Sequence, residues 1–248
     1  MHTILRPAIQ SIRGMGILLL CLGLLVPPLV QAGDAPGLAP FHATYTAAMD
    51  KGISLNGTAE RTLEDRGDGT WLYRTKVDSM IANIDESLVL KWQQGRVIPL
   101  SYRYRLSGFL IKNREKSIDF DWDKGRATGK DRGKSFNLAL EPGTLDPLGF
   151  QLQLRQDIRA GKLDMTYRII DKGKYDSDRF AVLDEDILDG PGGTITTIKA
   201  EKVRGENARR ETLMWFAPGQ DYLLVRLRQV EPDGTSYELR LKQAGTGS

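Results

Sequence analysis

Apolar and polar residues alternate one by one along much of the chain between residues 41 and 244. In the clearest run, Ile118, Phe120 and Trp122 lie on one side and three aspartates lie on the other. The same pattern recurs at 71–78, 102–107, 136–140, 165–169, 223–228 and 237–242. A period of two is that of a β-strand with one buried and one solvated face, which is typical of antiparallel sheets.

Turn-forming sequences separate these runs, at 66–69, 94–95, 124–125, 190–193 and 232–234. Glycine, proline and aspartate at such positions indicate tight connections between neighbouring strands. Because no long linker interrupts the pattern, we predict a single β-rich domain over residues 41–244. The expected fold is mainly β: a large, curved antiparallel sheet resembling half a barrel.

One segment, 146–160, has a different pattern. Asp146 is a good N-cap, Pro147 suits the first helical position, and Gly161 can end a helix. The alternative is a strand, because the apolar residues from Leu148 to Leu154 also alternate strictly. We predict a helix. Its apolar residues would cover more than half of its circumference, so we expect it to pack on the concave face of the sheet.

The first 32 residues have the features of a signal peptide. Arg6 and Arg13 precede an apolar run over 14–30, and small residues at Val30 and Ala32 mark a cleavage site. A membrane anchor is the alternative, although Pro27-Pro28 would break a spanning helix. A lipoprotein would require acylation of Cys21, which has no small residue before it. Residues 33–40, rich in glycine, proline and alanine, are expected to form a flexible leader.

Composition supports export to the periplasm. Cleavage after Ala32 removes the only cysteine, which suits an oxidising compartment. It also reduces the net charge from +3 to +1, because residues 1–32 carry two arginines and no acid. A nearly neutral chain has no excess of positive charge for a nucleic acid, so no nucleic-acid partner is expected.

Motifs that carry chemistry are scarce. The sequence has no nucleophile elbow, P-loop, dinucleotide-binding or zinc-protease motif, and His42 stands alone near the start of the first strand. The run 119–123 resembles a calcium loop but has Lys124 where such loops need glycine. The acidic segment 184–189 is expected to be a solvated loop, with weak calcium binding as the alternative. We therefore expect no enzyme, no metal site and no cofactor.

Two apolar features leave alternatives open. Aromatic residues gather on one face of the sheet, as ordinary core or as the wall of a hydrophobic cavity. The candidate ligand-binding residues are Trp92, Tyr104, Trp122, Leu148 and Leu152. The segment 108–111 (Gly-Phe-Leu-Ile) is apolar where a hairpin tip should be polar. Either the strands continue through it, or the tip touches a membrane, a partner or a ligand.

The order of these features resembles an exported bacterial family known as domain of unknown function 3108. The resemblance covers about residues 41–243 and rests on short motifs: Tyr45 to Met49, Ile53 to Glu64, Ser87, Val97-Ile98-Pro99, Phe120-Asp121, Asp146-Pro147-Leu148 through Leu154-Arg155, Met214-Trp215-Phe216 and Leu224-Val225-Arg226. Relatives usually have a proline where Leu223-Leu224 stands here. The resemblance implies a curved sheet with a helix on its concave face, similar to periplasmic lipoprotein carriers.

Three functions remain open at this stage. The first is a periplasmic, non-enzymatic binding or carrier protein for an amphipathic or lipid-like envelope molecule. The second is an envelope assembly or interaction factor with a filled core and a protein partner. A hydrolase that uses carboxylates such as Glu86 and Asp146 is the least favoured, because two such groups must share one cleft.

Overall fold

The computed structural model describes residues 37–52, 54–109, 111–205 and 207–246. The chain divides into Met1–Asp34 and Ala35–Ser248, and all described residues belong to the second unit. The predicted signal peptide, Cys21 and most of the predicted leader lie outside the described residues, whereas residues 37–40 have no regular secondary structure.

The described chain forms fifteen strands, one α-helix and one short 3-10 helix. In chain order they are β1 (Phe41–Asp50), β2 (Ser54–Asp65), β3 (Trp71–Ser79), β4 (Asn83–Gln93), β5 (Arg96–Ser107), β6 (Arg114–Asp121), β7 (Arg126–Asp131), β8 (Lys134–Ala139), β9 (Thr144–Leu145), α1 (Gly149–Arg159), β10 (Asp164–Asp171), β11 (Lys174–Gly190), β12 (Gly193–Val203), β13 (Glu211–Ala217), η1 (Pro218–Gln220), β14 (Leu223–Val230) and β15 (Ser236–Thr246).

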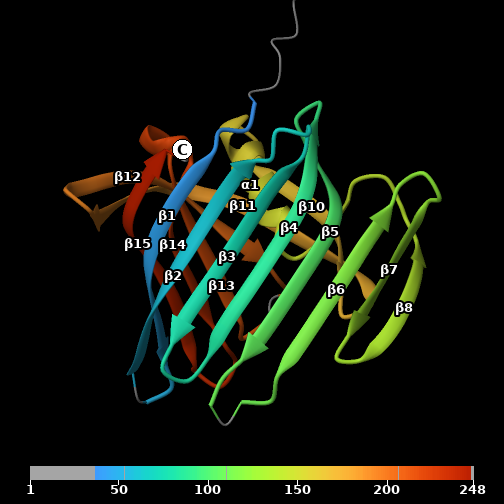
Figure 1. Ribbon diagram of the computed structural model, residues 1–248. Helices are drawn as coiled ribbons and strands as arrows, with labels where there is room; N and C mark the ends of the chain where they lie inside the picture. The colour runs from blue at the N-terminus through green and yellow to red at the C-terminus, as the bar shows by residue number, and fades with distance from the viewer. Residues whose placement is uncertain (1–36, 53, 110, 206, 247–248) are drawn as a thin grey trace, which may run out of the picture. The chain divides into compact units, whose positions relative to one another are not determined.

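All of these strands belong to one curved sheet (Figure 1). Strands that follow one another in sequence pair with each other, except β8 and β9, and β1 pairs with both β2 and β15. The first and last strands therefore lie side by side in the middle of the sheet, and β8 and β9 form its two edges. Every pairing is antiparallel except that of β9 with β10. The predicted fold class is confirmed.

The inner face of the sheet carries the core. Residues at alternate positions are buried, as the pattern predicted: Tyr73 and Thr75 in β3, Ile118 and Phe120 in β6, and Met165, Tyr167 and Ile169 in β10. In β14 the alternation fails, because Leu223, Leu224 and Val225 are all buried next to a β-bulge in the register with β13. Because only the inner face of the sheet is buried, the sheet curves around the element that covers this face.

Helix α1 covers that face, so the predicted helix is confirmed and the alternative of a strand is wrong. It begins at Gly149 rather than near 146, because residues 146–148 form a turn before it. Asp146 still acts as the cap: its Oδ1 accepts hydrogen bonds from the amides of Leu148 (2.9 Å) and Gly149 (3.0 Å). Gly161, with φ of +79°, ends the helix as expected.

One prediction about a loop is wrong, and one of the alternatives left open for another segment is excluded. The acidic segment 184–189 lies within β11, where Asp184 pairs with Lys199 (2.9 Å) and Asp186 accepts a hydrogen bond from the indole of Trp215 (3.0 Å). These acids have strand neighbours as partners, which the sequence pattern did not reveal. Conversely, the strands do not continue through 108–111, because β5 ends at Ser107 and β6 begins at Arg114.

Candidate ligand-binding site

Polar side chains of α1 attach the helix to both halves of the sheet. Gln151 accepts a hydrogen bond from the buried Arg61 of β2 (2.8 Å). One turn later, Arg155 donates to the main-chain carbonyl of Asp221 (2.9 Å) and stacks on the Phe41 ring at 4.7 Å. Arg61 also donates to the hydroxyl of Tyr73. Positions i and i+4 share a helix face, so these contacts form one polar stripe.

The opposite polar stripe of the helix joins β5 to β10. Gln153 donates to the carbonyl of Gly95 (3.1 Å) and to Asp157 (3.2 Å), and Asp157 accepts a hydrogen bond from the hydroxyl of Tyr167 in β10 (2.8 Å). Burial raises the pKa of the Tyr167 hydroxyl, and the nearby Asp157 carboxylate raises it further, so the hydroxyl remains a donor. The helix is thereby anchored on both sides.

These contacts leave little space between the helix and the sheet. The void beside Tyr45, Arg61 and Arg155 measures about 10 Å³, less than one water molecule needs for free entry and exit. Leu148, Leu152 and Leu154 are fully buried. The concave face of the described sheet therefore holds a filled core with polar contacts rather than an open apolar cavity.

The first part of β5 has an open edge. Strand β6 pairs with β5 only between Ser101 and Leu106, so Arg96 to Leu100 lacks a strand on that side. Two side chains replace the missing strand: Gln153 accepts from the Val97 amide (2.8 Å), and the Trp122 indole donates to the Pro99 carbonyl (2.7 Å). Satisfied backbone groups allow this edge to stay open without a large energetic cost.

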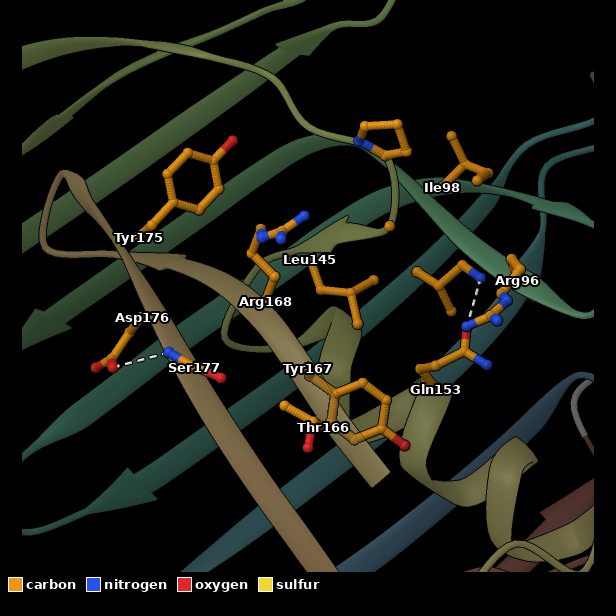
Figure 2. Close-up of a pocket in the computed structure, with 13 residues that line it drawn as sticks. Arg96, Ile98, Leu145, Gln153, Thr166, Tyr167, Arg168, Tyr175, Asp176 and Ser177 are labelled. Atoms are coloured by element: carbon orange, nitrogen blue, oxygen red, sulfur yellow. Dashed lines mark hydrogen bonds between the residues drawn. The ribbon is translucent and has the colours of Figure 1, made fainter. Parts of the chain in front are cut away.

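A pocket of about 840 Å³ lies beside this edge, where the sheet curves back toward β10 and β11 (Figure 2). It is lined by Arg96, Val97, Ile98, Pro142, Gly143, Leu145, Gln153, Thr166, Tyr167, Arg168, Tyr175, Asp176 and Ser177. We call it the edge pocket. Its volume lies in the range of small-molecule sites.

The edge pocket is mixed in chemistry. Val97, Ile98 and Leu145 supply apolar surface, Arg96 and Arg168 supply positive charge, and Asp176 supplies one negative charge. Arg168 pairs with Glu141 (2.9 Å), but Arg96 has no ion-pair partner among the described residues. A pocket with an apolar wall and an uncompensated guanidinium suits an amphipathic ligand that carries an anionic group.

A second hollow of about 550 Å³ lies near the start of β1 and the end of β15, and Phe41, Leu223 and Leu241 are among its lining residues. Arg155 and Asp221 also line it, and their side chains form an ion pair (2.9 Å). Because residues that precede it in the chain lie outside the described region, we build no site on this hollow.

The predicted ligand-binding residues lie elsewhere. Trp92 and Trp122 are half-buried: Trp92 lies opposite Val97 on β4, the paired side of β5, and Trp122 lies at the open edge of β5. Tyr104 lies further along β5, with the Lys116 ammonium 5.5 Å from its ring. Leu148 and Leu152 are core residues of the helix. None of the five residues lines the edge pocket.

Sequence reasoning missed the residues that do line it. Arg96 stands beside a turn and Arg168 on the polar side of an alternating strand, and both resemble ordinary surface residues. No signal in one sequence could have joined them, because their proximity depends on how far the sheet curves.

Other candidate groups have structural partners. Glu86 accepts a hydrogen bond from the hydroxyl of Tyr102 (2.6 Å), and burial raises the pKa of Glu86. Burial also raises the pKa of Asp146 to about 7. Neither carboxyl lines the edge pocket. His42 is exposed on β1 and lies 2.6 Å from Glu60.

The aspartates of 119–123 lie at the end of β6 and in the turn that follows it. Asp119 pairs with Arg103 on the neighbouring β5 (2.6 Å), and Asp121 pairs with Lys124 (2.8 Å). Within the described residues no group of three or more histidine, cysteine, aspartate or glutamate side chains could hold a metal ion. Among the same residues, no helix has both the length and the apolar character required to span a bilayer.

The fold and the pocket define the class of protein. It is an open, highly curved antiparallel sheet that wraps around one helix, with a pocket of apolar and charged residues at the open edge of β5. The chain belongs to the DUF3108 family, described as proteins of unknown function, whose model matches residues 61–242. The resemblance noted from the sequence is thereby confirmed. A comparison with curated protein sequences finds no match.

Solved structures support the fold. The chain is similar to a crystal structure from Brucella abortus, described as a beta-barrel-like protein of domain of unknown function DUF1849. The two share 13% sequence identity and a TM-score of 0.57 over 85% of this chain and 99% of the other. At this level of identity the likeness concerns the fold alone.

Proposed function

We propose that the protein is a periplasmic, non-enzymatic binding or carrier protein for an amphipathic, lipid-like envelope molecule, which binds in the edge pocket. The observation that carries the proposal is the pocket itself: about 840 Å³, with an apolar wall on β5 and β9 and positive charge at Arg96 and Arg168. Its size and mixed lining are those of small-molecule sites.

In this proposal the two parts of the ligand contact different walls. The apolar part packs against Val97, Ile98 and Leu145, and an anionic head group pairs with Arg96. Arg96 is available because none of the described carboxylates pairs with it, whereas Arg168 is held by Glu141. A charge-assisted hydrogen bond of this kind contributes about 1.5–3 kcal/mol.

A second candidate is an envelope assembly or interaction factor that acts through its surface. The observation that favours it is the filled concave face, where the void beside the helix is only about 10 Å³. A ligand is then unnecessary, and a protein partner takes its place. The two candidates differ in whether protein purified from the periplasm contains a bound small molecule.

Binding of a fluorescent fatty acid tests the choice. The wild-type protein is expected to bind the probe, and Arg96→Glu is expected to weaken binding roughly 10- to 100-fold, because the reversed charge repels the carboxylate. Arg126→Glu is the matched control, since Arg126 is also exposed but lies on β7, outside the pocket lining. It should bind like wild type. Mass spectrometry of an organic extract of the purified protein then identifies the natural ligand.

Two results would contradict the proposal, the first by favouring the assembly factor and the second by removing the ligand from the edge pocket. One is the absence of probe binding by the wild-type protein together with an empty extract. The other is equal binding by Arg96→Glu and wild type, which would place any ligand outside the edge pocket.

Export is the other part of the proposal, and it predicts a new N-terminus. Protein recovered from the periplasmic fraction is expected to begin at Gly33, because the apolar run and the small residues before it direct cleavage after Ala32. Edman sequencing or intact-mass measurement checks this. Recovery of the chain from the inner membrane with Met1 intact would contradict it.

A further inference from the structure

Two neighbouring hairpin tips expose large apolar side chains. Phe109, between β5 and β6, is 74% exposed, and Met80, between β3 and β4, is 95% exposed. The tips touch each other, because a β-carbon on Gly108 would overlap the main-chain carbonyl of Ile81. We call residues 79–83, 107–109 and 111–114 the tip pair; it lies at the lower end of the sheet in Figure 1.

Apolar side chains at a hairpin tip are unusual, because a turn in water is normally built from glycine, asparagine, aspartate or serine. Phe109 and Met80 contribute little to the core while they stay exposed, so they do not stabilise the fold by burial. Exposed apolar groups gathered at one place mark an interaction surface.

Positive charge surrounds the tip pair. Exposed cations occur in the tip pair itself and in the two nearest turns: Lys112, Arg114, Arg132, Lys134, Lys172 and Lys174. These turns lie close together. Lys116 of β6 lies opposite Asp131, at the β7–β8 turn, and forms an ion pair with Asp171, at the β10–β11 turn (2.7 Å). Among the described residues, only Lys172 of these six has a carboxylate within ion-pair distance, Asp171 at 3.7 Å.

Acidic groups at this end are fewer, and several are already paired. Glu115 pairs with Arg105 (3.2 Å), and Asp171 pairs with Lys116. Asp78 and Asp131 also lie near these turns. The turns at the opposite end of the sheet differ: Asp65 and Asp68 flank Arg66, and Asp121 and Asp123 flank the turn after β6. Positive charge thus collects at the apolar end.

We propose that the tip pair docks this end of the sheet onto the surface of a phospholipid bilayer that carries anionic head groups. Phe109 and Met80 enter the boundary between head groups and acyl chains, and the surrounding cations pair with phosphates. Charge complementarity selects a lipid surface over a neutral apolar partner. The proposal does not depend on the edge pocket, whose lining contains none of these residues.

A fluorescent label at the tip reports insertion directly. An environment-sensitive dye is attached to Phe109→Cys in the chain that begins at Gly33, which has no other cysteine, and vesicles with or without phosphatidylglycerol are added. We expect a blue shift only with the anionic vesicles, and a smaller shift at high salt because salt screens the charges. A dye at Asp123→Cys, in the turn at the other end of β6, serves as the control and should not respond.

Charge reversal tests the cations separately. Lys112→Glu with Arg114→Glu is expected to lower vesicle binding measured by the dye at least tenfold, since each basic residue near an anionic surface contributes roughly fivefold. Arg66→Glu with Arg126→Glu makes the same change of charge at the opposite end and should leave binding unchanged. All four side chains are exposed, so circular dichroism should report the native fold in both variants.

Three outcomes would overturn the proposal. The dye at position 109 does not respond to anionic vesicles, which would leave an acidic protein as the occupant of the surface. The dye responds equally to neutral vesicles. The two charge-reversal variants bind equally.

Discussion

Replacing Leu152 or Leu154 of α1 by alanine is expected to lower the free energy of unfolding by about 2–5 kcal/mol, the usual cost of truncating a buried leucine. Leu152 is 1% exposed and Leu154 is fully buried, and each lies on a helix whose polar side chains are bonded to both halves of the sheet. Because those contacts prevent the helix from moving inward, a cavity left by the truncation cannot collapse. Urea denaturation followed by tryptophan fluorescence measures the change.

Leu163 provides the matched control for these variants. It follows the same helix but is 68% exposed, so Leu163→Ala should change the free energy of unfolding by less than about 0.5 kcal/mol. If Leu152→Ala and Leu154→Ala were as mild as this control, the helix would not be the centre of the core, and the concave face would be more open than described.

Replacing Asp146 by asparagine is expected to remove a loss of stability that the wild-type protein shows as pH rises from about 4 to 7. Burial raises the pKa of this carboxyl to about 7 from its ordinary value of 3.8. Between those values the folded chain holds a proton that the unfolded chain has released, so the free energy of unfolding falls with increasing pH. At 1.36 kcal/mol for each pKa unit, the loss from this group reaches about 4 kcal/mol above pH 7.

Asparagine is the suitable replacement because its side-chain oxygen can keep both hydrogen bonds to the amides of Leu148 and Gly149. Asp146→Asn should therefore match wild type near pH 4 and exceed it in stability at pH 8. Asp146→Ala separates the cap from the charge: it lacks both, and should lose about 1 kcal/mol near pH 4. Glu86 stays in every variant, so its own titration cancels in the comparison. Parallel pH profiles of wild type and Asp146→Asn would contradict the assignment.

The helix shows how far local sequence signals reach. Asp146 and Gly161 mark its two ends through their own backbone chemistry, which acts over a few residues. The exact start shifts to Gly149 because Pro147 lies in a turn. The sequence did not predict the hydrogen bonds of the polar residues inside the helix, because the partners of Gln153 and Arg155 are 56 and 66 residues away in sequence.

The hairpin tip at 108–111 shows where pattern reasoning fails. Its apolar residues extend the alternation of β5, so a continued strand was one interpretation from sequence alone. The strand ends at Ser107 because the neighbouring β4 begins at Asn83, its register partner, and offers no further pairing. The position of the turn was determined by the pairing of β5 with β4 and not by the alternation of apolar and polar residues within β5.

By itself the sequence determined the β-rich fold class, the buried faces of most of the alternating strands, the helix and the family, because each depends on side chains a few residues apart or on a linear order of motifs. Only the tertiary structure decided the edge pocket. Its lining comes from β5, β9, β10, β11 and α1, segments that lie together because β1 pairs with β15 and the sheet then curves until β5 faces β10. A period of two tells which face of a strand is buried, but not which distant strand lies across the gap.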